Sequence, residues 1–314
     1  MRYIKNFREG MRVSDVYLLK QRQIQLTKNG KEYCSVVLQD KTGTIDGKIW
    51  DLGNPGIESV EAMEYVAVDG DVTVFNNAFQ LNIRRIRTAR EGEYYPSDYL
   101  PVSSRDADEM MTQFMGYIAS VKNTYLHRML EMLFVEDKEL MKKFAFSSAA
   151  KTIHHSFVGG LMEHTLGVAA MCEYFCKAYP FLHHDLLITA ALCHDIGKVK
   201  EILPYPENDY SDEGQLLGHI YMGAEMIDET IRRIDGFPRK LSAEIRHCIL
   251  AHHGELEYGS PKKPALAEAM ALNLADLADS RLEVVKELFE SSGDNKNWLG
   301  FNKLLDSNFR KAED

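Results

Sequence analysis

The sequence has no hydrophobic run of the about eighteen residues that a membrane-spanning helix needs. The stretch from Met1 to Phe7 lacks the apolar core of a secretory signal. The five cysteines are an odd number, and their spacing fits neither a disulfide framework nor a zinc site. These absences predict a protein without a membrane contact that resides in the reducing cytoplasm.

Acidic residues are in excess over the whole chain but not over its first part. The 314 residues are 45% hydrophobic, which favours two domains at this length, and they carry a net charge of −10. Residues 1–90 hold 14 Lys and Arg against 11 Asp and Glu, a net charge of +3, so the remainder carries −13. The total charge argues against a generic nucleic-acid coat protein. The contrast fits a binding module followed by a metal site, and ordinary variation of surface charge explains it equally well.

The first 90 residues have the pattern of short β-strands separated by turn signals. Asn29-Gly30, Gly43 and Asn76-Asn77 mark turns between stretches of alternating apolar and polar residues. This predicts five strands, with a short helix at residues 55–63 between the third and the fourth. Five strands in this order are typical of the OB-fold, a small all-β Greek-key barrel.

A barrel of this kind can hold single-stranded nucleic acid by stacking bases on aromatic side chains and binding phosphates with basic ones. The candidate residues for these contacts are Tyr33, Trp50, Phe75, Phe79, Arg84 and Arg85, with Arg87 and Arg90 close behind. Taken singly, each aromatic residue is more often part of a core than of a stacking surface, so we expect most of them in the core. The arginines predict an exposed basic face that suits phosphates.

The rest of the chain is predicted to be helical. Turn-forming residues such as Pro96 and Pro101 make residues 91–105 a linker. Helices are expected at 106–122, capped by Ser104, at 125–135, capped by Thr124, and at 136–145. No strand signal follows, so the predicted chain is multidomain, with an OB-fold barrel at 1–90 and an all-α helical bundle at 106–314. Such two-domain chains often assemble, but the sequence leaves a homo-oligomer open.

His194 and Asp195 stand side by side after an apolar helical run at residues 186–192. Two such polar groups at the end of a buried helix are costly to desolvate unless something binds them, and a divalent metal is a natural partner. Further polar side chains lie in apolar helical surroundings on both sides: His164, His219, His252, His253 and Asp276. One histidine on an apolar face is more often a satisfied core residue, but several such anomalies in one helical domain indicate a shared cation.

The candidates divide into two metal sites. His164, His194, Asp195 and Asp276 form a mixed imidazole and carboxylate shell that suits Mn, Fe or Zn, with Co and Mg as further options. His219 and His252, with His253, are expected to bind a second metal, and Asp195 is expected to bridge the two. Such a pair can supply a metal-activated hydroxide for attack on phosphorus, which makes Asp195 a catalytic residue.

Four other residues near this set have two interpretations each. Lys198 lies one turn beyond Asp195. It either contacts the scissile phosphate as a catalytic residue or is a lysine at the C-terminal end of a helix, where the helix dipole favours a positive charge. His154 and His155 either bind the substrate phosphate from a loop or form a packing pair. Asp279 either supports the ligands from behind or is a surface charge.

The order of these residues resembles a known family. His164, then His194-Asp195, then Asp276 is similar to the signature of the HD-domain phosphohydrolases, and His219 with His252-His253 is similar to their binuclear subset. This resemblance covers roughly residues 110–300. With the barrel in front and the stretch at residues 154–165, the whole chain resembles the YhaM-type 3′→5′ exoribonucleases of low-GC Gram-positive bacteria. The resemblance implies Mn-dependent removal of nucleotides from the 3′ ends of single-stranded RNA.

Three functions compete at this point. The first is a 3′→5′ exoribonuclease whose barrel holds the strand, with single-stranded DNA as another substrate because spacing cannot reveal a contact to the 2′-hydroxyl. The second is an HD-domain phosphohydrolase of a small nucleotide, such as a cyclic dinucleotide or a nucleoside triphosphate, with a regulatory barrel. The third is a nucleic-acid-binding protein with a structural or inactive metal site, and the intact ligand set argues against it.

Overall fold

The computed structural model describes the whole chain except residues 28, 77, 101, 151–156, 292–297 and 313–314. The chain forms two compact units, Met1–Pro101 and Val102–Asp314. Each unit has a hydrophobic core of its own. Within the described residues, none of the helices combines the length and the hydrophobicity that a membrane span requires.

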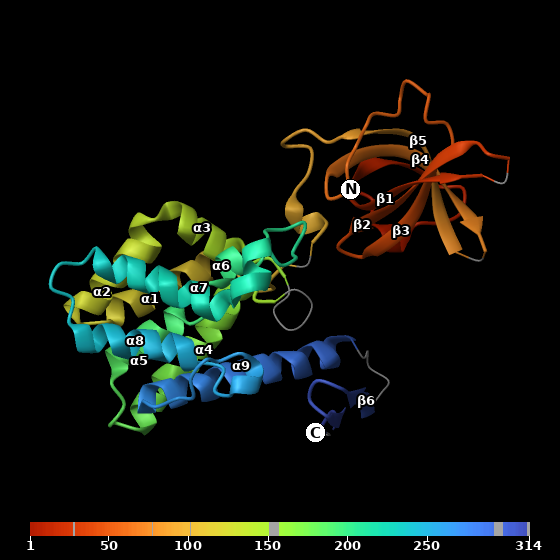
Figure 1. Cartoon of the computed structure of the whole chain (residues 1–314). Helices are drawn as coiled ribbons and strands as arrows, with labels where there is room; N and C mark the ends of the chain where they lie inside the picture. The colour runs from red at the N-terminus through yellow and green to blue at the C-terminus, as the bar shows by residue number, and fades with distance from the viewer. Residues whose placement is uncertain (28, 77, 101, 151–156, 292–297, 313–314) are drawn as a thin grey trace. The chain divides into compact units, whose positions relative to one another are not determined.

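The first unit is a closed barrel of five strands (Figure 1). Around the barrel the strands follow the order β1 (Arg12–Leu26), β2 (Glu32–Asp40), β3 (Gly43–Ile49), β5 (Ala78–Thr88) and β4 (Tyr65–Phe75). The long strand β1 pairs with β4 through its first half and with β2 through its second half. Strands β3 and β5 pair in parallel, which closes the barrel. This is the five-stranded Greek-key arrangement of the OB-fold, as predicted.

The prediction of a short helix between β3 and β4 is wrong. Residues 55–63 form turns, with one isolated bridge between Ile57 and Ile86. The backbone N–H of Glu58 donates to the carbonyl of Ile86, and the N–H of Ile86 donates to the carbonyl of Gly56, both at 2.9 Å. These backbone groups are bonded to β5 and therefore do not form the internal hydrogen bonds of a helix.

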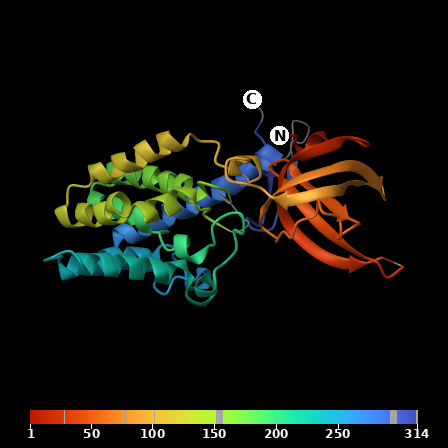
Figure 2. The same ribbon diagram turned by 90° about the horizontal axis from the view of Figure 1, so that it is seen from above.

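The second unit is mainly helical. Its helices are α1 (Ala107–Ser120), α2 (Thr124–Glu131), α3 (Lys138–Phe146), α4 (Gly160–Ala178), α5 (His184–Cys193), α6 (Lys198–Glu201), α7 (Asp212–Arg232), α8 (Arg239–Ala251) and α9 (Ala267–Ser291). A π-helical turn at Met132–Glu136 follows α2, and a short 3₁₀ turn occurs at Leu256–Tyr258. The first unit has two such 3₁₀ turns, at Ile4–Asn6 and Pro96–Asp98. Every residue of α5 from Leu186 to Cys193 is buried, which makes α5 the central helix of this unit. Figure 2 shows the long helix α9 running beside the other helices.

Two details of the predicted helical part are wrong. The helices α1 and α2 are capped by Asp106 and Asn123 rather than by Ser104 and Thr124, because these side chains accept the first free N–H groups. The unit is also not helical to its end, since β6 (Trp298–Asn302) and β7 (Ser307–Arg310) form an antiparallel hairpin. Both strands are exposed on their two faces, so they lack the alternation by which a half-buried strand is recognised.

Candidate metal centre

Five helices of the second unit bring polar side chains to one buried place. His164 lies on α4, His194 and Asp195 directly follow α5, and Asp276 lies on α9. The remaining histidines come from α7 and from the end of α8: His219, His252 and His253. His164, His194, Asp195 and His252 are each at most 2% exposed. The structure therefore brings together all the metal-ligand candidates predicted from the sequence.

The carboxylate of Asp195 lies at the centre, and its two oxygens face different histidines. Oδ2 lies 3.5 Å from Nε2 of His164 and 3.4 Å from Nε2 of His194. Oδ1 lies 3.5 Å from Nε2 of His219 and 3.6 Å from Nε2 of His252. Two groups of ligand atoms, each within 4.8 Å of one another, thus share this carboxylate: His164, His194 and Asp195, and Asp195, His219, His252 and His253.

Asp276 extends the first group. Its Oδ1 lies 3.2 Å from Nε2 of His164, although it is not within the tight set of that group. Asp279, one turn further along α9, contacts the other ring nitrogen of His164, with 2.7 Å between Nδ1 and Oδ2. Of the two interpretations of Asp279, the structure favours support of a ligand from behind.

Each histidine of the centre has its Nδ1 occupied by an acceptor outside the centre. Nδ1 of His219 lies 2.9 Å from Oε1 of Glu201. The other three donate to backbone carbonyls: His194 to Ala191 at 2.8 Å, His252 to Ile249 at 2.7 Å and His253 to Tyr258 at 2.7 Å. This fixes the ring orientations and leaves Nε2 for the centre, as is typical of histidines that bind metals.

Three buried atoms at the centre lack a hydrogen-bond partner within the described part of the chain: Oδ1 of Asp195, Nε2 of His219 and Nε2 of His252. Buried polar atoms in native proteins almost always have a partner. An acceptor oxygen and two imidazole nitrogens that face one another are a suitable donor set for a divalent cation. These residues therefore pass a chemical test for metal binding that does not depend on their order in the sequence.

The buried carboxylates and imidazoles of the centre shift each other's pKa values. Burial alone would raise the pKa of Asp195, but Lys198, whose Nζ lies 2.7 Å from Oδ2, and the neighbouring imidazoles hold this pKa well below its ordinary value. Burial would lower the pKa of His164, but Asp276 and Asp279 raise it to about 10. The carboxylates of Asp276 and Asp279 favour the protonated, positively charged form of His164. A metal cation can neutralise the same negative charge in place of that proton.

Two glycines let the helices come this close. A Cβ atom on Gly197 would collide with the backbone carbonyl of His219, and one on Gly167 would collide with the carboxylate of Asp279. Gly197 closely follows His194-Asp195 in the sequence. Its role is steric, because only a residue without a side chain leaves room for the backbone of His219.

A backbone break places His219. Helix α7 is kinked at Gly218, which has φ of 72° and ψ of 153°. The N–H of His219 is therefore released from the helix and donates to Oε1 of Glu201 at 2.9 Å. Glu201 thus holds both the backbone and the ring of His219. No signal in the sequence distinguishes Glu201 from the other acidic residues, so it was not predicted as a site residue.

The predicted aromatic residues of the barrel are mostly exposed, so the expectation of core positions is wrong. Trp50 is 45% exposed, Phe75 63% and Phe79 47%. Tyr33 is partly buried and stacks on Trp50, with 4.9 Å between ring centroids. Phe75 is the last residue of β4 and Phe79 the second of β5, so both lie at the hairpin end of these strands, where their side chains are exposed.

The other substrate-binding candidates have different surroundings. Arg84 forms ion pairs with Asp69 at 3.6 Å and Asp71 at 2.9 Å, so its charge is balanced locally. Arg85 lies on β5 beside the turn at Gly56. His154 and His155 lie outside the described residues.

Three comparisons show which known proteins this chain is similar to. Residues 161–280 match the family model of the HD domain. The chain is 35% identical over 279 residues to the 3′-5′ exoribonuclease YhaM of Geobacillus sp. (strain WCH70), which covers 88% of this chain and 85% of that protein. It is 31% identical over 282 residues to the 3′-5′ exoribonuclease YhaM of Bacillus subtilis (strain 168), which covers 90% and 88%. A solved structure, the second OB-fold domain of replication protein A from Methanococcus maripaludis, is 18% identical and covers 29% of this chain and 96% of its own, with a TM-score of 0.23.

The change Glu201→Ala should weaken metal binding, because the carboxylate that holds the ring of His219 is lost. We expect the Kd for Mn²⁺ to rise roughly 10- to 100-fold, as measured by isothermal titration calorimetry. Glu229→Ala, at an exposed position of α7, the helix that carries His219, is the control and should keep the wild-type Kd. An unchanged Kd in Glu201→Ala would show that His219 is held without this carboxylate.

Proposed function

The chain belongs to the YhaM family of 3′-5′ exoribonucleases, and we infer that it hydrolyses single-stranded RNA from the 3′ end at the centre around Asp195. The observation that carries this inference is the Asp195 carboxylate, whose two oxygens each face two histidines. The HD domain is a family of metal-dependent phosphohydrolases, so the site and the relatives support the same class of reaction. The relatives' names favour RNA over a small nucleotide as the substrate.

We propose two divalent metals per chain. One would be held by His164, His194, Asp195 and Asp276, and the other by Asp195, His219, His252 and His253. Imidazole and carboxylate ligands suit Mn²⁺, and Fe, Co, Mg or Zn ions can occupy comparable shells. When bound, the metals supply Lewis acidity that polarises the phosphoryl group and acidifies the attacking water.

Lys198 is proposed as the fixed positive charge beside the reacting phosphate. Its side chain is 10% exposed, and it lines a pocket together with His164 and Asp276. An oxygen from water forms a bond to phosphorus, the bond from phosphorus to the leaving sugar oxygen breaks, and that oxygen takes up a proton. A cation held in this place stabilises the negative charge that develops on the phosphoryl and leaving oxygens.

The barrel is proposed to hold the RNA strand. Trp50, Phe75 and Phe79 are exposed, and every base has a flat face that can stack on an exposed aromatic ring. Stacking of this kind accepts DNA as well as RNA, so single-stranded DNA is a second ligand to be compared.

The free thiols of all five cysteines fit a reducing compartment such as the cytoplasm.

Incubation with Mn²⁺ and 5′-labelled single-stranded RNA should give a ladder of stepwise shortened products. A chelator should stop the reaction, and Asp195→Asn should abolish it and lower the bound Mn²⁺, because the central ligand loses its charge. Asp235→Asn, at an exposed position, is the control and should behave as the wild type. Intact RNA together with hydrolysis of a cyclic dinucleotide or a nucleoside triphosphate would contradict the ribonuclease and favour the small-nucleotide hydrolase.

The double change Phe75→Ala/Phe79→Ala should weaken RNA binding by the full-length chain. Stacking is worth about 1–3 kcal/mol per base, so the Kd should rise roughly 5- to 150-fold for each stacked base lost. Fluorescence anisotropy with Asp195→Asn protein measures binding without cleavage. Phe181→Ala, a 74% exposed aromatic position of the helical unit, serves as the control. Equal Kd values for both variants would exclude these two rings from the RNA-binding surface.

A further inference from the structure

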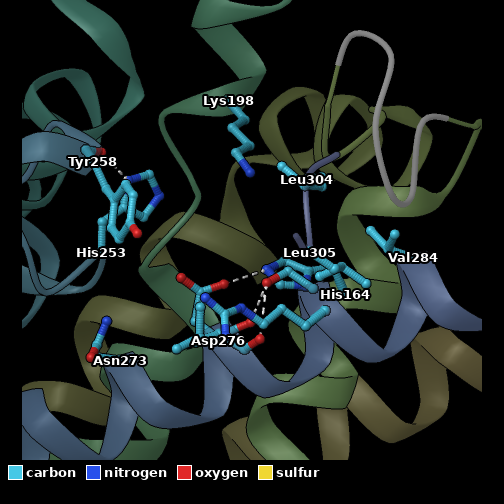
Figure 3. Close-up of a pocket in the computed structure, with 12 residues that line it drawn as sticks. His164, Lys198, His253, Tyr258, Asn273, Asp276, Val284, Leu304 and Leu305 are labelled. Carbon is cyan, nitrogen blue, oxygen red and sulfur yellow. Dashed lines mark hydrogen bonds and ion pairs between the residues drawn. The ribbon is translucent and has the colours of Figure 1, made fainter. Parts of the chain in front are cut away.

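A pocket of about 280 Å³ lies beside the metal centre, along one face of α9 (Figure 3). Six residues of α9 at helical spacing contribute to it: Asn273, Asp276, Leu277, Ser280, Arg281 and Val284. From Asp276 to Val284 the helix rises about 12 Å, comparable to the span of a phosphate, a sugar and a base placed end to end. The pocket therefore extends from the metal centre over the length of one nucleotide.

The part of the pocket farther along α9 is apolar and is completed by the C-terminal hairpin. Leu304 and Leu305, in the turn between β6 and β7, lie together with Val284 at the end opposite His253 and Tyr258 in Figure 3. The turn is fixed because Oδ1 of Asn302 accepts the N–H groups of Leu304 at 2.9 Å and Leu305 at 3.0 Å.

The residue that follows the hairpin lies close to α9. The amine of Lys311, directly after β7, lies 5.9 Å from the ring centroid of Phe289 in the last turns of α9. Leu304 is 56% exposed, so its side chain is accessible to a ligand in the pocket.

A cation stands beside this apolar surface. Arg281 lines the pocket, its side chain is exposed, and it forms no ion pair with another described residue. A guanidinium group can stack on a flat ring and donate hydrogen bonds to the acceptors of its edge. An apolar wall next to an unpaired guanidinium suits a nucleobase, which has apolar faces and a polar edge, better than it suits a purely apolar ligand.

We propose that this pocket binds the base of the 3′-terminal nucleotide, and that Leu304 and Leu305 form the wall against which the base packs. The proposal rests on the proposed function, because it places the scissile phosphate at the metal centre. A volume of about 280 Å³ matches the size of one nucleoside. A pocket for one nucleoside next to the reacting phosphate selects the end of a strand, which gives the exonucleolytic mode a structural cause.

The test pairs a change in the protein with a change in the substrate. Full-length wild-type protein and the Leu304→Ala/Leu305→Ala variant, both loaded with Mn²⁺, receive 5′-labelled RNA that ends either in an ordinary nucleotide or in an abasic ribose. In the wild type, loss of the terminal base should lower kcat/KM of the first cleavage roughly tenfold or more. In the variant the two RNAs should differ by less than about threefold, and KM for the ordinary RNA should rise roughly tenfold.

The control is Leu282→Ala, which removes a 61% exposed leucine of α9 that does not line the pocket, and it should keep the wild-type preference. If the double variant does not fold, Leu304→Ala alone provides the same comparison. A wild type that cleaves both RNAs equally, or a variant that keeps the wild-type preference, would overturn the proposal. A wild type that leaves both RNAs intact would overturn the proposed function instead, so the two failures are distinguishable.

Discussion

The carboxylate of Asp195 is the group on which the helical unit depends. It is 2% exposed, and an isolated charge in such a place would be strongly destabilising. Its two oxygens are directed at different pairs of imidazoles, and these come from helices that are far apart in the sequence. The packing of α4, α7 and α8 around α5 is therefore also the geometry of a divided ligand shell. Stability and metal binding in this unit are coupled through one side chain.

The surroundings of Asp195 make the shell rigid before a metal arrives. Glu201 and Asp279 hold the outer nitrogens of His219 and His164, and backbone carbonyls hold the other rings. Side chains held in this way would lose little freedom on binding a metal, which would favour affinity and the positioning of a phosphate. The face of α9 then continues from Asp276 to the apolar wall at Leu304 and Leu305, so in the proposed function one helix would link the chemistry to recognition of the strand end.

The cluster of histidines and carboxylates around Asp195 could be predicted from the sequence because these residues contradict their surroundings. His194-Asp195 after an apolar run, and Asp276 among leucines and alanines, are anomalies that a reader of the sequence can find. Glu201 is no anomaly in the sequence, since only its contact with His219 gives it a role. The C-terminal hairpin, exposed on both faces, has no periodic signal, and residues 55–63 form no helix because Ile86 of a distant strand takes up their hydrogen bonds. The role of Glu201 and the absence of a helix at residues 55–63 depend on contacts between segments that are distant in the sequence.

The division of the site by Asp195 is the central claim, and a titration of the wild-type chain with Mn²⁺ followed by electron paramagnetic resonance tests it most directly. Two cations that share one carboxylate lie close enough to couple their electron spins. The account predicts saturation at two Mn²⁺ per chain, with an exchange-coupled signal once the second ion binds. Saturation at one Mn²⁺ per chain, with the six-line signal of an isolated ion, would contradict it.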